Sequence, residues 1–226
     1  MRGCTHGMAE RSLLDARFSL KEAGMGKVHE ITVWTSGVVK DKEGRDVANG
    51  LALAGSKEGK FVQAFDNYVD LPDRVNVPVR KYARISDEEI EMRYEYENHH
   101  PEVVVLVTDA IVKGMNVLLG MPKGGVLVVN TPRKPEQILK FVPNKELLKA
   151  LVCVDADGIA GKSTVDFSGS EGGIDATQLG AGVAAPLLGA IAKATGLVKL
   201  QSLEQVVANK AALKTGYDQA VVHNVN

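Results

Sequence analysis

Four short apolar runs constrain the fold of this chain more than any other feature of its sequence. Their interiors carry no charge and are rich in β-branched residues, a pattern typical of strands buried on both faces of a parallel sheet. The runs cover residues 30–34, 103–107, 126–130 and 151–155. Two less regular runs, residues 61–65 and 79–85, predict further strands.

Helical patterns lie between these runs. Residues 46–58 place apolar side chains on one side, and they are followed by Gly59, a residue typical of helix ends. Residues 109–119 and 144–150 predict two further helices, each starting at a residue that can cap a helix N-terminus.

The alternation of strands and helices predicts an α/β fold class. We expect a Rossmann-like, mostly parallel sheet with helices on both faces, because parallel neighbours are joined by right-handed crossovers. Neither an internal repeat nor a linker divides the chain. We therefore expect one α/β domain over residues 25–226, preceded by an N-terminal extension over residues 1–24.

The final third has a different composition. Residues 158–182 are rich in Gly, Ser, Thr and Asp, which predicts a long loop. Residues 183–195 are apolar on nearly every side, so this helix is expected to be buried, beneath a partner chain. Gly196 then ends the helix, and Ser202 with Gln205 predicts a capping box that starts the next one.

The charge balance excludes several classes of function. The chain has 27 Lys and Arg against 28 Asp and Glu, which gives no global attraction to nucleic acid or to an anionic membrane. Aromatic residues make up only 5%, too few for a stacking platform for single strands. No stretch approaches the ~20 apolar residues that cross a bilayer, and the N-terminal segment lacks the apolar core of a secretory signal. We therefore expect a cytoplasmic protein.

The two cysteines limit the redox chemistry of the chain. Cys153 lies inside an apolar run, where a buried and inert thiol is expected, and Cys4 lies in the weakly patterned N-terminus. A [4Fe-4S] cluster takes about four cysteine ligands. This chain cannot hold one alone, so any clusters belong to other chains.

Residues 156–163 resemble a phosphate loop, because they follow a strand and end in Gly-Lys-Ser. Backbone amides would hold phosphates, with Lys162 on the terminal phosphate and Ser163 on magnesium. However, the first glycine of the pattern is replaced by alanine, and residues 165–170 have no helical pattern. A freestanding nucleotide-binding protein therefore remains a less favoured alternative.

A second polar group surrounds the adjacent His99 and His100, with Glu95, Glu97 and Glu102 nearby. Such residues can bind a metal, but adjacent histidines seldom reach one ion. The stretch precedes a proline and a buried strand, so a solvated turn is the better interpretation, and we expect no metal site. No other motif supplies a catalytic group.

Five stretches between Ile31 and Tyr217 stand out when taken together. They are Gly-Lys-Phe-Val-Gln-Ala-Phe at 59–65, Arg-Ile-Ser-Asp at 84–87, Pro-Glu and the apolar run at 101–106, Gly to Asn-Thr at 125–131, and the late helix at 188–198. In this order and spacing they resemble the gamma subunit, or domain III, of the pyruvate:ferredoxin oxidoreductase family.

This resemblance implies a subunit without chemistry of its own. In the family, oxidative decarboxylation is divided between thiamine-diphosphate domains and iron–sulfur domains, and the gamma part is a Rossmann-like domain that helps to hold coenzyme A. The resemblance thus implies no cofactor and no catalytic residue on this chain. Thiamine diphosphate, magnesium and [4Fe-4S] clusters are expected on thiamine-binding and ferredoxin-like partner subunits, with external ferredoxin as the electron acceptor.

The chain departs from the family where the first strand ends. The family has Gly-Arg-Gly-Gly-Gln-Gly there, whereas residues 35–46 keep only two glycines, and Asp41, Glu43 and Asp46 would repel phosphate. The positions equivalent to the coenzyme A loop are Ser36, Gly37, Lys40, Lys42, Gly44 and Arg45. The loop at residues 35–46 resembles the corresponding loop of oxalate oxidoreductase, the family branch that needs no acyl acceptor. This resemblance implies that the loop does not bind coenzyme A and that the assembly oxidises oxalate to carbon dioxide.

Two alternatives within the family stay open. A coenzyme A-dependent subunit for pyruvate or another 2-oxoacid could replace the glycine amides with the charges of Lys40, Lys42 and Arg45. A purely structural subunit would contact no ligand, and substitutions in the loop would then change assembly but not substrate affinity.

Overall fold

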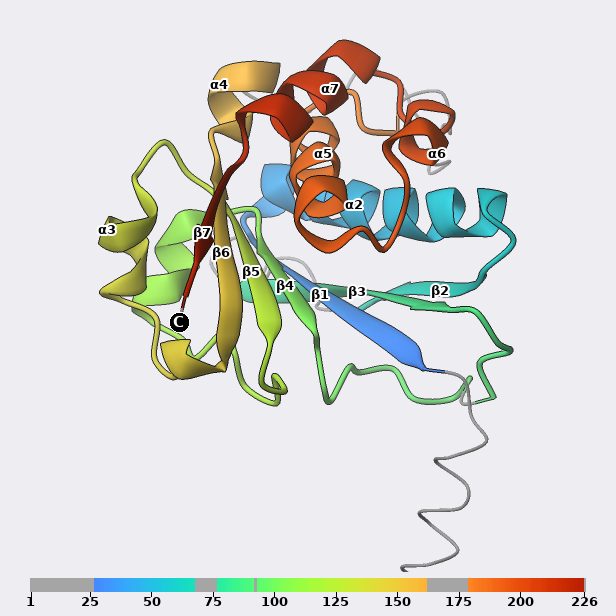
Figure 1. The fold of residues 1–226 in the computed structure, drawn as a ribbon, viewed down its shortest axis with the longest axis horizontal. Coiled ribbons are helices and arrows are strands. Elements are labelled where there is room, and N and C mark those ends of the chain that lie inside the picture. Colours follow the sequence, from blue (N-terminus) through green and yellow to red (C-terminus); the bar gives the residue numbers. More distant parts are fainter. Residues whose placement is uncertain (1–26, 68–76, 92, 162–178, 226) are drawn as a thin grey trace, which may run out of the picture.

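The computed structural model describes residues 27–67, 77–91, 93–161 and 179–225. The expected N-terminal extension, residues 1–24, lies outside these ranges. All the described strands form one sheet of seven, in the order β2-β3-β1-β4-β5-β6-β7 (Figure 1). The strands are β1 (Val28–Ser36), β2 (Phe61–Asp66), β3 (Pro78–Ser86), β4 (Val103–Leu106), β5 (Gly125–Asn130), β6 (Leu148–Val154) and β7 (Val221–Asn224).

The sheet is mixed but mostly parallel, as the sequence predicted. Strands β1, β4, β5 and β6 are consecutive parallel neighbours. Strand β3 runs antiparallel to both β1 and β2, and β7 runs antiparallel to β6. The six predicted strands are present within a few residues. Strand β7 was not predicted, because its four residues are mostly exposed and do not form an apolar run.

Helices cover both faces of the sheet, as expected, but unequally. The described helices are α2 (Val38–Lys57), α3 (Pro135–Leu139), α4 (Ala156–Ala160), α5 (Ala184–Thr195), α6 (Leu200–Glu204) and α7 (Lys210–Gln219), with 3₁₀ turns η2 (Asp109–Lys113) and η3 (Lys145–Leu147). Helices α2, α5, α6 and α7 form the thick layer (Figure 1). The opposite face carries η2, α3 and irregular segments, which bury a second core around Leu106, Leu127 and Leu151. No helix in the described ranges is both long enough and apolar enough to span a membrane.

Two predicted helices are wrong in their extent. The helix expected at 109–119 is a 3₁₀ turn that ends at Lys113, where Gly114 and the glycine at 120 break the pattern. The helix expected at 144–150 is the short turn η3, because Asn144 is left-handed (φ 56°) and β6 already begins at Leu148.

Helix starts were also mispredicted. Helix α2 begins at Val38, eight residues before the expected start at Asp46. The predicted capping box is wrong, since α6 is capped at Lys199 and Ser202 is buried inside it. Of the loop expected at 158–182, the first residues belong to α4, and residues 162–178 lie outside the described ranges.

Helix α5 is buried by its own chain rather than by a partner, which corrects the expectation for residues 183–195. Every residue from Ala184 to Ala192 is buried, and the helix contacts α7, α2, β5 and β6. Helix α7 crosses it closely, because a Cβ on Gly189 would lie 2.2 Å from the Leu213 carbonyl oxygen. The predicted end of α5 at Gly196, in the left-handed conformation, is confirmed.

We predict that Gly189→Ala lowers the free energy of unfolding by about 1–3 kcal/mol, because α7 must move away from α5. The added carbon would meet backbone atoms of α7, which cannot rotate aside as a side chain can. Urea unfolding of the full chain measures the effect. Gly114→Ala is the matched control, since a Cβ there meets nothing within 4 Å and φ is negative. Equal losses in the two variants would contradict the close crossing.

Glu58 makes the stability of the helical layer depend on pH. Its Oε1 accepts from the backbone N–H of Lys199 at 2.6 Å, and Oε2 lies 3.3 Å from Lys60 Nζ. Burial opposes the charge, but the Lys199 amide, the Ser202 hydroxyl and Lys60 outweigh it and lower the pKa of Glu58 below its ordinary value of 4.5. A lowered pKa stabilises the folded state above the unfolded pKa, and that stability is lost as the pH falls through the folded pKa.

We therefore predict that Glu58→Gln reduces the loss of unfolding free energy between about pH 5 and pH 3. Urea titrations at several pH values in this window measure the slope. The exposed Glu146 provides the control, and Glu146→Gln is expected to leave the slope unchanged. An identical slope in wild type and Glu58→Gln would remove Glu58 from the acid response.

Candidate functional site

The carboxyl ends of the parallel strands meet at one edge of the sheet, the position where open α/β sheets usually bind ligands. Strand β1 leads there into α2, β4 into η2, β5 toward α3 and β6 into α4. We call this the carboxyl edge.

The segment expected to be a coenzyme A-type loop is the first part of a helix. Ser36 is the last residue of β1, and Gly37 caps α2 with φ 86°, a conformation that side-chain-bearing residues rarely adopt. Gly44 lies inside the helix, where a Cβ would approach Thr35 Cγ2 to 2.1 Å. This glycine therefore allows α2 to pack on β1 and does not expose backbone amides to a ligand.

The three predicted cations of this segment are each paired with a carboxylate of the same chain. The pairs are Lys40 with Asp157, Lys42 with Asp46 (2.9 Å), and Arg45 with Asp66 (2.7 Å). Of the three, only Lys40 reaches a residue of the carboxyl edge. The arrangement does not bring Lys40, Lys42 and Arg45 together as a phosphate-binding group.

The three carboxylates expected to repel phosphate point into the protein, which corrects that expectation. All three residues are more than nine-tenths buried. Their partners are Lys81 Nζ at 2.8 Å from Asp41 Oδ1, the Ala184 N–H at 2.8 Å from Glu43 Oε2, and the Gly180 N–H at 3.2 Å from Asp46 Oδ2. They fasten α2 to β3 and to the start of α5, so they do not set the charge of an open loop.

Lys81 lies at the centre of a cluster of charges that it forms with Arg45, Asp41 and Asp66. Its side chain is fully buried on β3, and its Nζ also lies 3.4 Å from Asp66 Oδ2. Arg45 contacts both carboxylates, Asp66 at 2.7 Å and Asp41 at 3.5 Å. Burial opposes the charge of Arg45, but Asp66 and Asp41 outweigh it and raise its pKa. Two cations and two anions thus stabilise one another between α2, β2 and β3.

Asn130 organises the carboxyl edge, although the sequence did not single it out as a site residue. Its Nδ2 donates to the Val107 carbonyl at 3.0 Å and to Asp157 Oδ2 at 2.9 Å. Its Oδ1 accepts from the backbone N–H groups of Ala156 at 3.0 Å and Asp157 at 3.4 Å. One amide therefore joins the ends of β4, β5 and β6, and through Asp157 it connects to Lys40 of α2.

A second polar group continues this edge toward α3. Thr131 Oγ1 donates to Asp109 Oδ2 at 3.0 Å, and Arg133 Nη1 lies 3.2 Å from the same oxygen. The Gly-to-Asn-Thr stretch at 125–131 therefore has a physical role, since its last two residues hold the neighbouring strand ends.

Residues 156–163 do not form a phosphate loop in their described part. Residues 156–160 are helix α4, and its first amides are already used. Asn130 accepts from Ala156 and Asp157, the Asp155 side chain accepts from Gly158 at 2.9 Å, and the Asp155 carbonyl accepts from Ile159. Lys162 and Ser163 lie outside the described residues.

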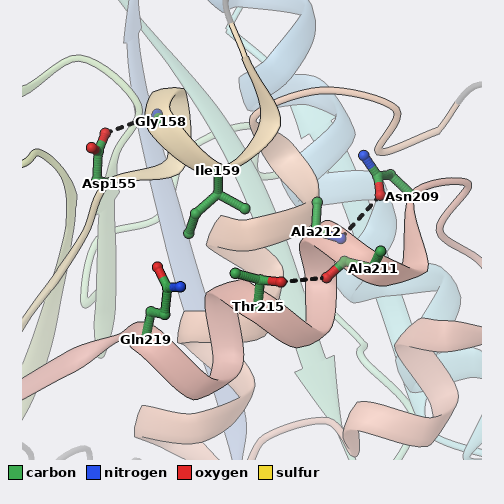
Figure 2. Close-up of a pocket in the computed structure, with 8 residues that line it drawn as sticks. All are labelled: Asp155, Gly158, Ile159, Asn209, Ala211, Ala212, Thr215 and Gln219. Carbon is green, nitrogen blue, oxygen red and sulfur yellow. Dashed lines mark hydrogen bonds between the residues drawn. The ribbon is translucent and has the colours of Figure 1, made fainter.

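A pocket of about 440 Å³ lies between α4 and α7 (Figure 2). Its polar side chains are mostly engaged in hydrogen bonds with the backbone of α4 and α7. Asn209 Oδ1 accepts from the Ala212 N–H at 3.0 Å, and Thr215 Oγ1 donates to the Ala211 carbonyl at 2.9 Å. The pocket offers few polar groups to a ligand and no arrangement for catalysis.

The glutamates around the histidine-rich turn contact neighbouring basic or imidazole side chains of the same chain. His99 Nε2 lies 2.8 Å from Glu95, Glu97 pairs with Arg80, and Glu102 contacts His29 at 2.7 Å. Within the described ranges, no group of three or more His, Cys, Asp or Glu is placed to hold a metal ion.

Cys153 is buried in β6, as the sequence predicted. Burial, assisted by the charge of Glu136, raises the pKa of the thiol to about 12. The thiol therefore remains protonated and inert at neutral pH. Cys4 lies outside the described residues.

The sheet order, the parallel core and the polar contacts at its carboxyl edge define a Rossmann-like α/β domain. Residues 46–226 match the pyruvate ferredoxin/flavodoxin oxidoreductase family, and the chain belongs to that family. The match begins inside α2 and leaves β1 and the α2 start outside it.

Named relatives support this membership. The chain is 33% identical over 188 residues to the common gamma subunit of the pyruvate/ketoisovalerate oxidoreductases of Thermococcus kodakarensis, covering 79% of this chain and 91% of that protein. It is 33% identical over 184 residues to pyruvate synthase subunit PorC of Thermotoga maritima, covering 75% and 84%. The crystal structure of the pyruvate oxidoreductase subunit PorC from the same organism is similar with a TM-score of 0.64 at 27% identity, covering 88% of this chain and 99% of that one.

Proposed function

We propose that this chain is the gamma-type subunit of a multi-subunit oxidoreductase that oxidises a 2-oxoacid and passes the electrons to ferredoxin. The observation that carries the proposal is the family match over residues 46–226, together with gamma-subunit relatives that the chain matches over most of their length. The polar groups at the carboxyl edge are engaged in holding strand ends, which suits a supporting rather than a catalytic role.

The cofactors of such an enzyme belong, in this proposal, to partner subunits. Thiamine diphosphate and magnesium are assigned to thiamine-binding subunits, and [4Fe-4S] clusters to a ferredoxin-like subunit. The single cysteine among the described residues is buried and protonated, so it is unsuited to ligate a cluster.

We further propose that the reaction needs no coenzyme A, with oxalate as the first candidate substrate. Oxalate dianion yields two molecules of carbon dioxide and two electrons, so no acyl group requires a thiol acceptor. The support is the β1–α2 junction. The glycine-rich turn is replaced by a helix, and Lys40, Lys42 and Arg45 are neutralised by carboxylates of the chain. These residues do not fit the phosphates of coenzyme A.

A coenzyme A-dependent enzyme for pyruvate or ketoisovalerate is the second candidate. It is favoured by the relatives at 33% identity, which are subunits of pyruvate/ketoisovalerate oxidoreductases and of pyruvate synthase. In such an enzyme coenzyme A would be held elsewhere on this chain or on its partners.

The test is turnover of the purified complex. Ferredoxin reduction is measured with oxalate, pyruvate and ketoisovalerate, each with and without coenzyme A. We expect oxalate-dependent reduction that coenzyme A does not change, and no coenzyme A binding by isothermal titration. Pyruvate turnover that requires coenzyme A would overturn the oxalate proposal but leave the gamma-subunit proposal intact. A complex without ferredoxin-reducing activity on any 2-oxoacid or oxalate would overturn both.

A further inference from the structure

The thin face of the sheet carries an exposed apolar surface beside η2 and α3, which lie next to each other in Figure 1. Met115 is 39% exposed and Phe141 is 47% exposed. Two hollows, of about 410 and 310 Å³, share Lys113, Lys140 and Phe141 in their walls. Phe141 therefore stands between two open grooves on the surface rather than covering a core.

The walls of these hollows are positively charged. Lys113, Lys140 and Arg133 line them, and no carboxylate does. Arg133 is paired with Asp109, whereas Lys113 Nζ lies 5.3 Å from the centre of the Phe141 ring. Within the described part of the chain, neither Lys113 nor Lys140 has a carboxylate at ion-pair distance.

The charge imbalance is local to this face. Residues 109–147 contain six lysines and arginines but only three acids, whereas the whole chain has a net charge of −1. Exposed aromatic, methionine and arginine side chains, which Phe141, Met115 and Arg133 supply here, are typical of protein interfaces. Purely apolar cover would take the two unpaired ammonium groups out of water without compensation, which is unfavourable.

We propose that the Phe141 groove, formed by Lys113, Met115, Arg133, Lys140 and Phe141, docks an acidic segment of another subunit. An apolar side chain of that segment packs on Phe141, and its carboxylates meet Lys113 and Lys140. The two lysines are exposed on flexible stems, and the neighbouring backbone N–H groups of Gly114, Met115, Phe141 and Val142 are already donated to local carbonyls. This arrangement suits protein carboxylates better than a small phosphate ligand. The inference rests on the proposed function only in requiring that this chain assembles with other subunits.

The test uses the intact complex, purified through a tag on this chain, with partner retention measured against salt concentration. We expect Lys113→Glu/Lys140→Glu to weaken retention about tenfold or more, because like charges now face each other. Lys123→Glu/Lys145→Glu makes the same charge change outside the groove and is expected to stay within about twofold of wild type. Melting temperatures of the isolated chains verify that both variants fold.

A photo-crosslinker placed at Phe141, as Phe141→p-benzoylphenylalanine, identifies the occupant. We expect a product with a peptide of another subunit that carries an excess of Asp and Glu. An intact complex that gives no product, or a product only with a neutral or basic segment, overturns the inference. Unchanged partner retention in the groove variant, with altered coenzyme A binding by calorimetry, would mark a small-anion site instead. If the wild-type chain assembles with no partner at all, the proposed function itself fails.

Discussion

Replacing Lys81 with methionine is expected to lower the free energy of unfolding by about 3–5 kcal/mol, more than any other substitution that we consider. Lys81 is fully buried and lies 2.8 Å from Asp41 and 3.4 Å from Asp66. Methionine fills a similar volume, so the loss measures the charge rather than a cavity. The change leaves the buried Asp41 and the partly exposed Asp66 with Arg45 as their remaining cation in the cluster. Urea unfolding monitored by circular dichroism measures the effect.

Arg93→Ala is the matched control, because Arg93 and its partner Glu89 are both 63% exposed. Exposed pairs contribute about 0–1 kcal/mol. The double variant Lys81→Met/Asp41→Asn tests the pairing directly, since it removes one uncompensated charge and should recover part of the loss. A loss below about 1 kcal/mol for Lys81→Met would show that the cluster is not a source of stability.

Asn130→Ala is expected to cost about 2–4 kcal/mol, because it leaves several buried backbone groups without partners. Its amide now satisfies the Val107 carbonyl and the Ala156 N–H, and it orients Asp157. The same change should loosen α4, which hydrogen exchange at residues 156–159 would detect as faster amide exchange.

Asn116→Ala provides the comparison, since Asn116 is exposed and makes one side-chain contact, with the Leu118 N–H. We expect it to cost less than about 1 kcal/mol. If Asn130→Ala unfolds at the same denaturant concentration as Asn116→Ala, the strand ends are held by other contacts.

The sheet could be predicted because the strands are the most apolar parts of the chain. Strands β4, β5 and β6 are buried over their whole lengths or nearly so, and composition alone marks such segments. The first two turns of α2 were missed for the opposite reason. Asp41, Glu43 and Asp46 are buried but charged, and their partners, such as Lys81 and Ala184, are far away in sequence. A pattern of polarity cannot detect burial that depends on such partners.

The site was predictable only in part for the same reason. Asn130 belongs to a recognisable stretch at the end of β5, so its role at a strand end could have been predicted from the sequence. Its connection to Lys40 through Asp157 spans 117 positions and requires the folded sheet. Ser36 and Gly37 could be placed at the end of a strand from the sequence, whereas the pairing of Lys40 with Asp157 could be seen only in three dimensions.

The burial of α5 within this chain bears on the order in which an assembly forms. Because α2 and α7 already cover this apolar helix, its burial does not depend on another subunit. We therefore expect the chain to fold before it meets its partners, so its isolation as a folded monomer would not argue against membership of a larger enzyme.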